Sequence, residues 1–235
     1  MSLIKPFTGL RPAPGRAVEV AAPPYDVMSA AEARAMVEGR PWSFLHISRP
    51  EVDLSPDTDP YAPEVYAKAR ENLETMLSER ILVRDPRPCY YVYRLTMGEH
   101  VQTGLVAAAS VAAYDGERIK KHEFTRPVKE DDRVRQIDAL NAQTGPVFLV
   151  YKSRASIDDA LGRAAASPPA IDITATDGVT HQLWVVDDTP TIDLLSSEFE
   201  ALDALHVADG HHRSAAASRV ATQRRAANPN HTGAE

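Results

Sequence analysis

The stretch Val207-Ala208-Asp209-Gly210-His211-His212-Arg213 decides how the rest of the chain is interpreted. The apolar run at residues 205–208 predicts the end of a buried strand. The Ala-rich segment that follows, residues 214–220, favours a helix. The stretch is therefore predicted to be a strand-to-helix turn.

A turn of this kind suits an anion, because the first backbone N–H groups of a helix lack intrahelical partners and the helix dipole makes that end positive. Gly210 allows the chain to turn and a ligand to approach the backbone. Arg213 can direct two donors at a phosphate, and His211 and His212 add further donors. Asp209 would repel a phosphate unless a cation such as Mg²⁺ bridges them or a proton moves, which indicates chemistry rather than passive binding.

Two other interpretations of this turn stay open. In the first, Asp209 is only a helix N-cap, Gly210 only a turn residue, and the histidines only solvent-facing side chains. In the second, His206, His211, His212 and Asp209 bind a metal, although their spacing matches no zinc pattern with two separated ligand pairs.

The motif D-G-H-H-R entering an Ala-rich helix resembles the signature of the ParB/sulfiredoxin-like superfamily, in particular its free-serine kinases, where this loop holds the nucleotide phosphates. The chain as a whole resembles one branch of that superfamily, the family known as domain of unknown function 1015. The segments that carry this second resemblance are IKPFTGLRP, VAAPPYDV, SFLHISRPE, QTGLVAAASV, RIKKHEFTRP, LNAQTGPVF and VADGHHR, spread from Ile4 to Arg213. Family members are longer, so the resemblance implies that this chain lacks a C-terminal part.

The composition is typical of a soluble globular protein, with 43% hydrophobic and 25% charged residues in 235. The single cysteine, Cys89, excludes an internal disulfide and, within an apolar run, is expected to be a buried thiol. No membrane-spanning stretch or signal peptide is present, so we expect a cytoplasmic protein. The formal net charge of −7 argues against a general nucleic-acid binder. The oligomeric state cannot be read from the sequence.

The pattern of elements predicts an α+β fold with a mixed sheet, β-hairpins and packed helices, which the resemblance makes a ParB/sulfiredoxin-like core with an N-terminal α/β elaboration. We expect a Pro-rich and helical region at 1–86, the core at 87–227 and an unstructured tail at 228–235. Alternation from Trp42 to Ile47 predicts a strand. The expected hairpins pair residues 90–97 with 101–114 and 171–176 with 179–186, and the expected helices cover 30–37, 62–80, 130–143, 156–166 and, capped by Thr189 or Thr191, the segment up to 202.

Other candidate site residues lie outside the turn. Glu123 follows His122 among Lys120, Lys121 and Arg126, and these cations would favour the ionised form of its carboxylate. Lys121 is also a candidate for binding phosphate. In the serine kinases a comparable H-E pair supplies the catalytic glutamate, so the resemblance implies that role for Glu123. A charged edge loop is the alternative.

Two loops supply possible substrate contacts. Tyr25 and Asp26 lie in the loop after Pro23-Pro24, where a turn with a packed ring is the alternative. Asn141, Gln143 and Thr144 are uncharged hydrogen-bonding groups between a helix and a strand, where helix C-capping is the alternative. Asn141, Gln143 and Thr144 would read a base, a ribose or an amino-acid head group.

The leading hypothesis is nucleotide-dependent phosphoryl transfer, from ATP or ADP with Mg²⁺, to a small hydroxylated metabolite such as serine. Glu123 would accept the hydroxyl proton, and Asp209 would place Mg²⁺ or assist as a base. Gly210, His211, His212 and Arg213 would hold the phosphates. The alternatives are a non-catalytic nucleotide-sensing or nucleic-acid-binding module of the ParB type, and a scaffold without activity.

Overall fold

The structure is a computed structural model that describes residues 2–230, and its contacts divide the chain into two compact units. Unit 1 comprises residues up to Ala21, Glu79–Ser110 and Tyr151–Asp203, and unit 2 comprises Ala22–Ser78, Val111–Val150 and the residues from Ala204 onward. The units interleave along the chain, whereas the sequence pattern predicts contiguous regions at 1–86 and 87–227. Of the predicted tail at 228–235, residues 231–235 lie outside the described part.

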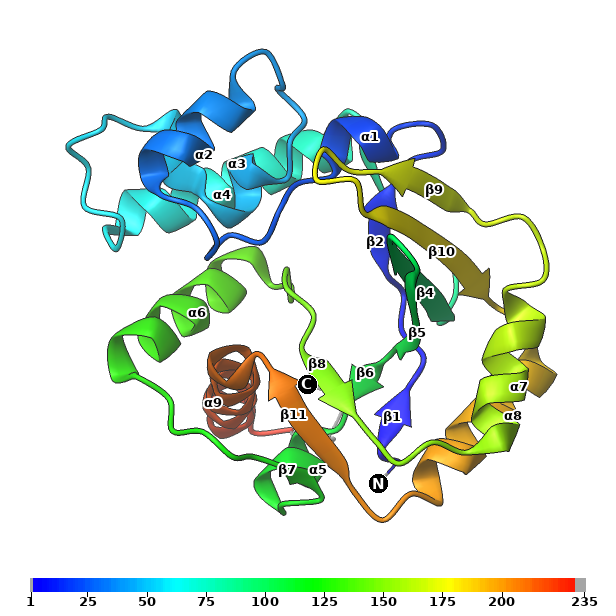
Figure 1. Cartoon of the computed structure of the whole chain (residues 1–235). Coiled ribbons are helices and arrows are strands. Elements are labelled where there is room, and N and C mark those ends of the chain that lie inside the picture. The colour runs from blue at the N-terminus through cyan, green and yellow to red at the C-terminus, as the bar shows by residue number, and fades with distance from the viewer. Residues whose placement is uncertain (1, 231–235) are drawn as a thin grey trace. The chain divides into compact units, whose positions relative to one another are not determined.

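Unit 1 is built around an antiparallel four-stranded sheet in the order β5-β4-β10-β9 (Figure 1). The two pairs β1–β6 and β2–β3 are also antiparallel. Its elements are β1 (Ile4–Lys5), β2 (Leu10–Pro12), α1 (Ala17–Val20), β3 (Leu82–Arg84), β4 (Tyr90–Met97), β5 (His100–Val106), β6 (Ala108–Ala109), α7 (Ala155–Ala164), β9 (Ile171–Thr174), β10 (Thr180–Val186) and α8 (Thr189–Glu200).

Unit 1 contains a partly buried ion pair between Arg11 and Asp85. The Asp85 carboxylate accepts hydrogen bonds from the Arg11 guanidinium at 2.7 and 3.0 Å and from the Tyr91 hydroxyl at 2.7 Å. The Tyr91 hydroxyl also accepts the Gly9 N–H at 2.9 Å. Burial acts to raise the pKa of Asp85, but the hydrogen bonds from Arg11 and Tyr91 outweigh it and hold that pKa below its ordinary value.

Unit 2 combines helices with a small mixed sheet in the order β7-β11-β8, in which β11 is parallel to β7 and antiparallel to β8. Its elements are α2 (Ala30–Val37), α3 (Leu45–Ser48), the 3₁₀ helix η1 (Pro50–Asp53), α4 (Pro63–Ser78), α5 (Val111–Asp115), β7 (Ile119–Lys120), α6 (Pro127–Leu140), β8 (Phe148–Val150), β11 (Leu205–Asp209) and α9 (His211–Ala227).

Helices α6 and α9 pack together through Val134, Ala216 and Val220, with Ile137 at the edge. A small residue, Ala216, at this contact lets the two helices approach closely. Polar contacts add specificity, since the Tyr66 hydroxyl of α4 donates to Asp132 of α6 at 2.8 Å, and the buried Gln136 amide of α6 donates to the Ile47 carbonyl at 2.8 Å. Helix α9 is therefore anchored through α6 to the helical part of unit 2.

The α+β class is confirmed, and so are both hairpins in outline, but several local predictions are wrong. Residues 42–47 form a turn and α3 instead of a strand, because a short apolar run cannot be told from a helical turn by periodicity alone. The second strand of the first hairpin ends at Val106, and β6 and α5 occupy the segment after it. Helix α8 is capped by Asp188, whose side chain accepts the Thr191 N–H at 3.0 Å, not by a threonine.

In the described residues no helix is long and apolar enough to cross a membrane. Cys89 is a buried free thiol, as expected, and burial raises its pKa.

Candidate anion-binding site

The predicted strand-to-helix turn is present: β11 ends at Asp209, and α9 begins at His211. Gly210 is the N-cap residue, with a left-handed φ of 97° and no side-chain cap. The register of β11 on β8 shifts between Val207 and Asp209, an irregularity of the kind that re-aims the side chains next to it. Since Ser214 is the first residue of α9 whose N–H bonds back, to the Gly210 carbonyl, the backbone N–H groups of residues 211–213 are left without a partner among the described residues.

His211 is the most unusual residue of this turn. Its side chain is only 5% exposed, and its Nε2 atom is the buried side-chain polar atom that finds no hydrogen-bond partner within residues 2–230. Its Nδ1 atom lies 3.5 Å from Oε2 of Glu123, and the ring of His122 meets it edge-on with centroids 4.5 Å apart. An unpaired buried polar group costs about 1–3 kcal/mol, so its retention points to a ligand.

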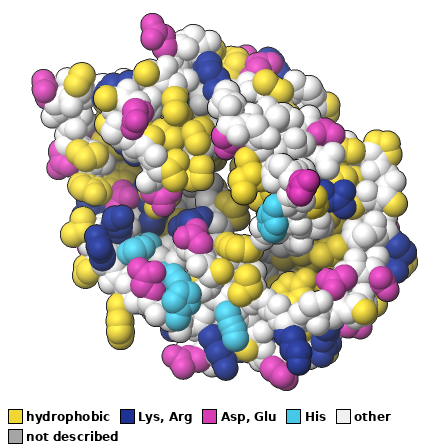
Figure 2. Space-filling view, viewed as in Figure 1, with side chains coloured by type: hydrophobic (Ala, Val, Ile, Leu, Met, Phe, Trp, Pro, Cys, Tyr) yellow, Lys and Arg dark blue, Asp and Glu magenta, His cyan; other side chains and the backbone are white. Residues whose placement is uncertain are grey.

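The loop at residues 121–126 lies over this first turn of α9. Besides the contacts of His122 and Glu123 with His211, the Arg126 N–H donates to Nε2 of His212 at 3.0 Å. This bond ties the loop to the first turn of α9. Figure 2 shows histidine and acidic side chains next to one another at the surface where α9 lies in Figure 1.

Glu123 is 61% exposed, and the partner that the structure gives it is His211. Lys121 is one of the cations predicted to surround Glu123, but its ammonium group lies 4.4 Å from the centroid of the Tyr114 ring. Tyr114 belongs to α5, which packs on α9, so Lys121 stays near the site through a cation–π contact.

The sequence predicts that Arg213 binds phosphate, and the structure shows its partners within the protein. Its side chain is 18% exposed, with Nη1 donating to the Pro146 carbonyl and Nη2 to Oδ2 of Asp209 at 2.5 Å. Two glycines form its slot, since a Cβ at Gly145 would lie 3.2 Å from its Cδ and one at Gly210 would lie 3.2 Å from its Nε. The guanidinium therefore orients Asp209, whose carboxylate is 71% exposed and whose Oδ1 accepts no hydrogen bond within residues 2–230.

Tyr25, a predicted substrate contact, lies against Arg133 of α6. The Arg133 guanidinium lies 4.1 Å from the centroid of its ring, and Arg49 holds the loop by donating to the Tyr25 carbonyl at 2.7 Å. Burial raises the pKa of Tyr25, while the charges of Arg133 and, more weakly, Arg213 oppose that rise. Its hydroxyl has no hydrogen-bond partner in the described chain, whereas Asp26 next to it is exposed.

The second predicted loop is divided. Asn141 is the left-handed C-cap of α6, and its side-chain oxygen accepts from Arg224 of α9 at 2.5 Å. Arg224 is eleven residues beyond Arg213, about 16 Å along the helix, so Asn141 serves the helix ends rather than the turn. Gln143 is exposed and Thr144 half-buried, and both directly precede the Gly145–Pro146 contact with Arg213.

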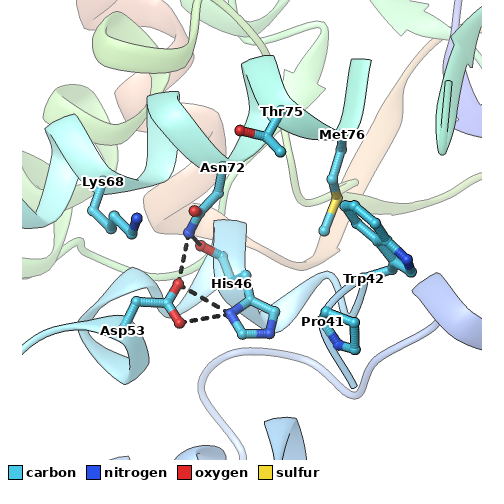
Figure 3. A pocket seen from close by; sticks show the side chains of 8 residues that line it. All are labelled: Pro41, Trp42, His46, Asp53, Lys68, Asn72, Thr75 and Met76. Carbon is cyan, nitrogen blue, oxygen red and sulfur yellow. Dashed lines mark hydrogen bonds and ion pairs between the residues drawn. The ribbon is translucent and has the colours of Figure 1, made fainter. Parts of the chain in front are cut away.

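The structure also contains a pocket that the sequence did not indicate. It has a volume of about 400 Å³, lies between α4 and the segment from Pro41 to Asp53, and is drawn in Figure 3. Nδ1 of His46 donates to Asp53 at 2.8 Å, and the Asn72 amide donates to the same carboxylate at 2.8 Å. Nε2 of His46 lies 3.1 Å from the Arg40 carbonyl, so this network satisfies its own polar groups and calls for no ligand.

The comparisons with known proteins identify the family. The family described as "Protein of unknown function (DUF1015)" matches residues 4–235. The chain belongs to this family. Neither a search of curated proteins nor a search of solved structures gave a match.

Membership accounts for the segments from Ile4 to Arg213 on which the resemblance rests. It leaves the wider likeness to ParB and sulfiredoxin, and any activity, as hypotheses.

Proposed function

We propose that this DUF1015 protein catalyses nucleotide-dependent phosphoryl transfer, from ATP or ADP to the hydroxyl of a small metabolite, with serine as the simplest acceptor. The observation that carries the proposal is the buried Nε2 of His211, which has no partner within residues 2–230, at the uncapped N-terminus of α9. The exposed carboxylate of Glu123 lies 3.5 Å from Nδ1 of the same ring, and Asp209 precedes the turn, paired with Arg213.

The protonation of His211 links this site to both reactants. Because Nδ1 faces the Glu123 carboxylate, an acceptor, the hydrogen of a neutral ring belongs on Nδ1. Nε2 then needs a donor, which a substrate group other than the attacking hydroxyl, such as the ammonium group of serine, would supply. If the ring is positively charged, Nε2 needs an acceptor instead, which a phosphate oxygen supplies. The exposed ring of His122 lies edge-on to the ring of His211.

The phosphates of the nucleotide have a complementary cradle. The three unpaired N–H groups of residues 211–213 point out of the positive end of a 17-residue helix, and Gly210 adds no side chain that would block an approach to the backbone. Preorganised donors of this kind stabilise charge at a transferring phosphoryl group without reorganisation.

The carboxylates fit the two remaining tasks. Glu123, exposed and within reach of His211, would accept the proton of the attacking hydroxyl. Asp209 has one oxygen on Arg213 and one free, which fits a Mg²⁺ ion that arrives with the nucleotide, since Mg²⁺ is usually bound by one or two carboxylates plus phosphates and water. No group of three or more ligating side chains able to hold a resident metal occurs in the part of the chain that the structure describes. When bound, Mg²⁺ would neutralise the charge that develops on the phosphates.

The test measures turnover of ATP, ADP or CTP, each supplied with Mg²⁺ and serine, by ³¹P NMR. Glu123→Gln and Asp209→Asn should each lower the rate by about a hundredfold or more, the usual loss for a general base or a charge-positioning group. Glu74→Gln, an exposed carboxylate on α4, should leave the rate unchanged. Full turnover in both site variants would refute the proposal, and nucleotide binding without any turnover would favour the non-catalytic nucleotide-sensing alternative.

A further inference from the structure

The loop that covers the first turn of α9 carries an aromatic side chain at its tip. Phe124 is 98% exposed, so its ring is not packed against any of the residues that the structure describes. Burying a side chain of this size stabilises a protein by about 1.5–3 kcal/mol relative to leaving it exposed, and Phe124 contributes none of this to folding. Its exposure therefore calls for another explanation than the core.

The position of Phe124 is fixed on both sides. Glu123 before it lies 3.5 Å from Nδ1 of His211, and Thr125 after it donates to Glu130 at 2.6 Å. The Arg126 N–H then bonds to His212. Phe124 therefore lies in a loop whose residues 123 and 126 contact the two histidines.

The loop that carries this free aromatic ring therefore contacts, through its neighbouring residues, the first turn of α9, whose N–H groups are free. A ligand that uses both must carry an anionic group for the helix end and a flat ring for Phe124. Phosphate alone has no ring, and an apolar protein surface would not match the charged side chains of Glu123 and Arg126 on either side of Phe124. A nucleotide has both features, because every base offers a π-face and stacking does not depend on which base it is.

We infer that Phe124 is a stacking platform for the base of the nucleotide whose phosphates bind the first turn of α9. This inference rests on the proposed function, and it adds the residue that binds the base of the nucleotide. Because Phe124 directly follows Glu123, stacking of the nucleobase on Phe124 would also bring the nucleotide to the carboxylate that is proposed as the general base.

The experiment compares the affinity of the whole chain for Mg²⁺–ATP with that for Mg²⁺ and inorganic triphosphate, which lacks the base and ribose, by isothermal titration calorimetry. Phe124→Ala should weaken ATP binding by about five- to a hundredfold, the range for loss of one base–aromatic stack, and change triphosphate binding by less than about twofold. Phe124→Tyr keeps the ring and should restore ATP affinity. Met97→Ala, which removes another exposed apolar side chain, from unit 1, should change neither affinity.

The outcomes separate this inference from the proposed function. If Phe124→Ala weakens both ligands equally, or neither, or if tyrosine fails to restore ATP binding, the stacking role is wrong while the anion site stands. If the unmodified chain binds neither ATP nor triphosphate, the anion site itself is rejected, and the stacking role with it.

Discussion

Replacing Gly210 by alanine should damage the turn in two ways that can be measured separately. The first is backbone strain, because a φ of 97° is a conformation that side-chain-bearing residues rarely adopt, at a cost of about 1–2 kcal/mol. The second is crowding, because the new Cβ would lie 3.2 Å from Nε and 3.3 Å from Cζ of Arg213. A displaced Arg213 loses its ion pair with the exposed Asp209, which adds up to about 1 kcal/mol. The expected loss is about 1–3 kcal/mol.

Two other glycines provide matched controls. Gly178 has a similar φ of 83°, and a Cβ added there would have no other atom within 4 Å, so Gly178→Ala should show strain alone, about 1–2 kcal/mol. Gly145 faces Arg213 at 3.2 Å without a left-handed φ, so Gly145→Ala should show crowding alone, under about 1 kcal/mol. The sum of the two controls should approximate the effect of Gly210→Ala.

The assay is native-state hydrogen exchange read by mass spectrometry, because Gly178 lies in unit 1 and the other two glycines lie in unit 2. Opening free energies are compared for β9–β10 in Gly178→Ala, and for β11–α9 in Gly145→Ala and Gly210→Ala. Triphosphate affinity, measured in parallel, should fall strongly in Gly210→Ala and stay within about twofold in Gly178→Ala. Equal stability losses in Gly210→Ala and Gly178→Ala, with triphosphate binding intact in both, would refute the close approach of Arg213 to Gly210.

Two further predictions concern unit 1. Gly9→Ala would place a Cβ 2.5 Å from the Tyr91 hydroxyl, which its hydrogen bond to Asp85 holds in place. Urea denaturation should therefore show that the free energy of unfolding falls by about 1–3 kcal/mol. An unchanged midpoint would contradict this packing. The lowered pKa of Asp85 means that its stabilising effect is present above the ordinary value of 3.8 and is lost as the pH falls through its lower folded-state pKa. Urea midpoints of the unmodified chain and Asp85→Asn should therefore differ most near neutral pH and converge below about pH 4, and a gap that widens in acid would contradict the assignment.

The turn at residues 207–213 could be predicted because its signals are local. An apolar run, a glycine and an Ala-rich segment follow one another in the chain, and each acts on the backbone where it stands. The α+β class and the hairpin at Asp177-Gly178 were predictable for the same reason. Local signals failed at residues 42–47, where a short apolar run fits a strand and a helical turn equally well.

The contacts within the candidate site could not be predicted, because they are tertiary. Asp209 and Arg213 are four residues apart, a spacing visible in the sequence, yet only the structure shows that the Gly145–Pro146 loop holds the guanidinium against the carboxylate. The sequence predicts that Lys121 faces a phosphate, but its cation–π contact with Tyr114 depends on the placement of α5. The burial of His211 likewise depends on the distant loop at residues 121–126, which the fold brings onto the first turn of the helix.

The most direct measurement of the central claim is amide NMR of the ¹⁵N-labelled chain titrated with inorganic triphosphate. If phosphates bind the first turn of α9, the backbone amide signals of His211, His212 and Arg213 should shift with saturation, because their N–H groups are free. The first turn of α8, where Asp188 already accepts the Thr191 N–H, should show no such shift. Unmoved amides in α9, or equal shifts at both helices, would contradict the existence of an anion site at this turn.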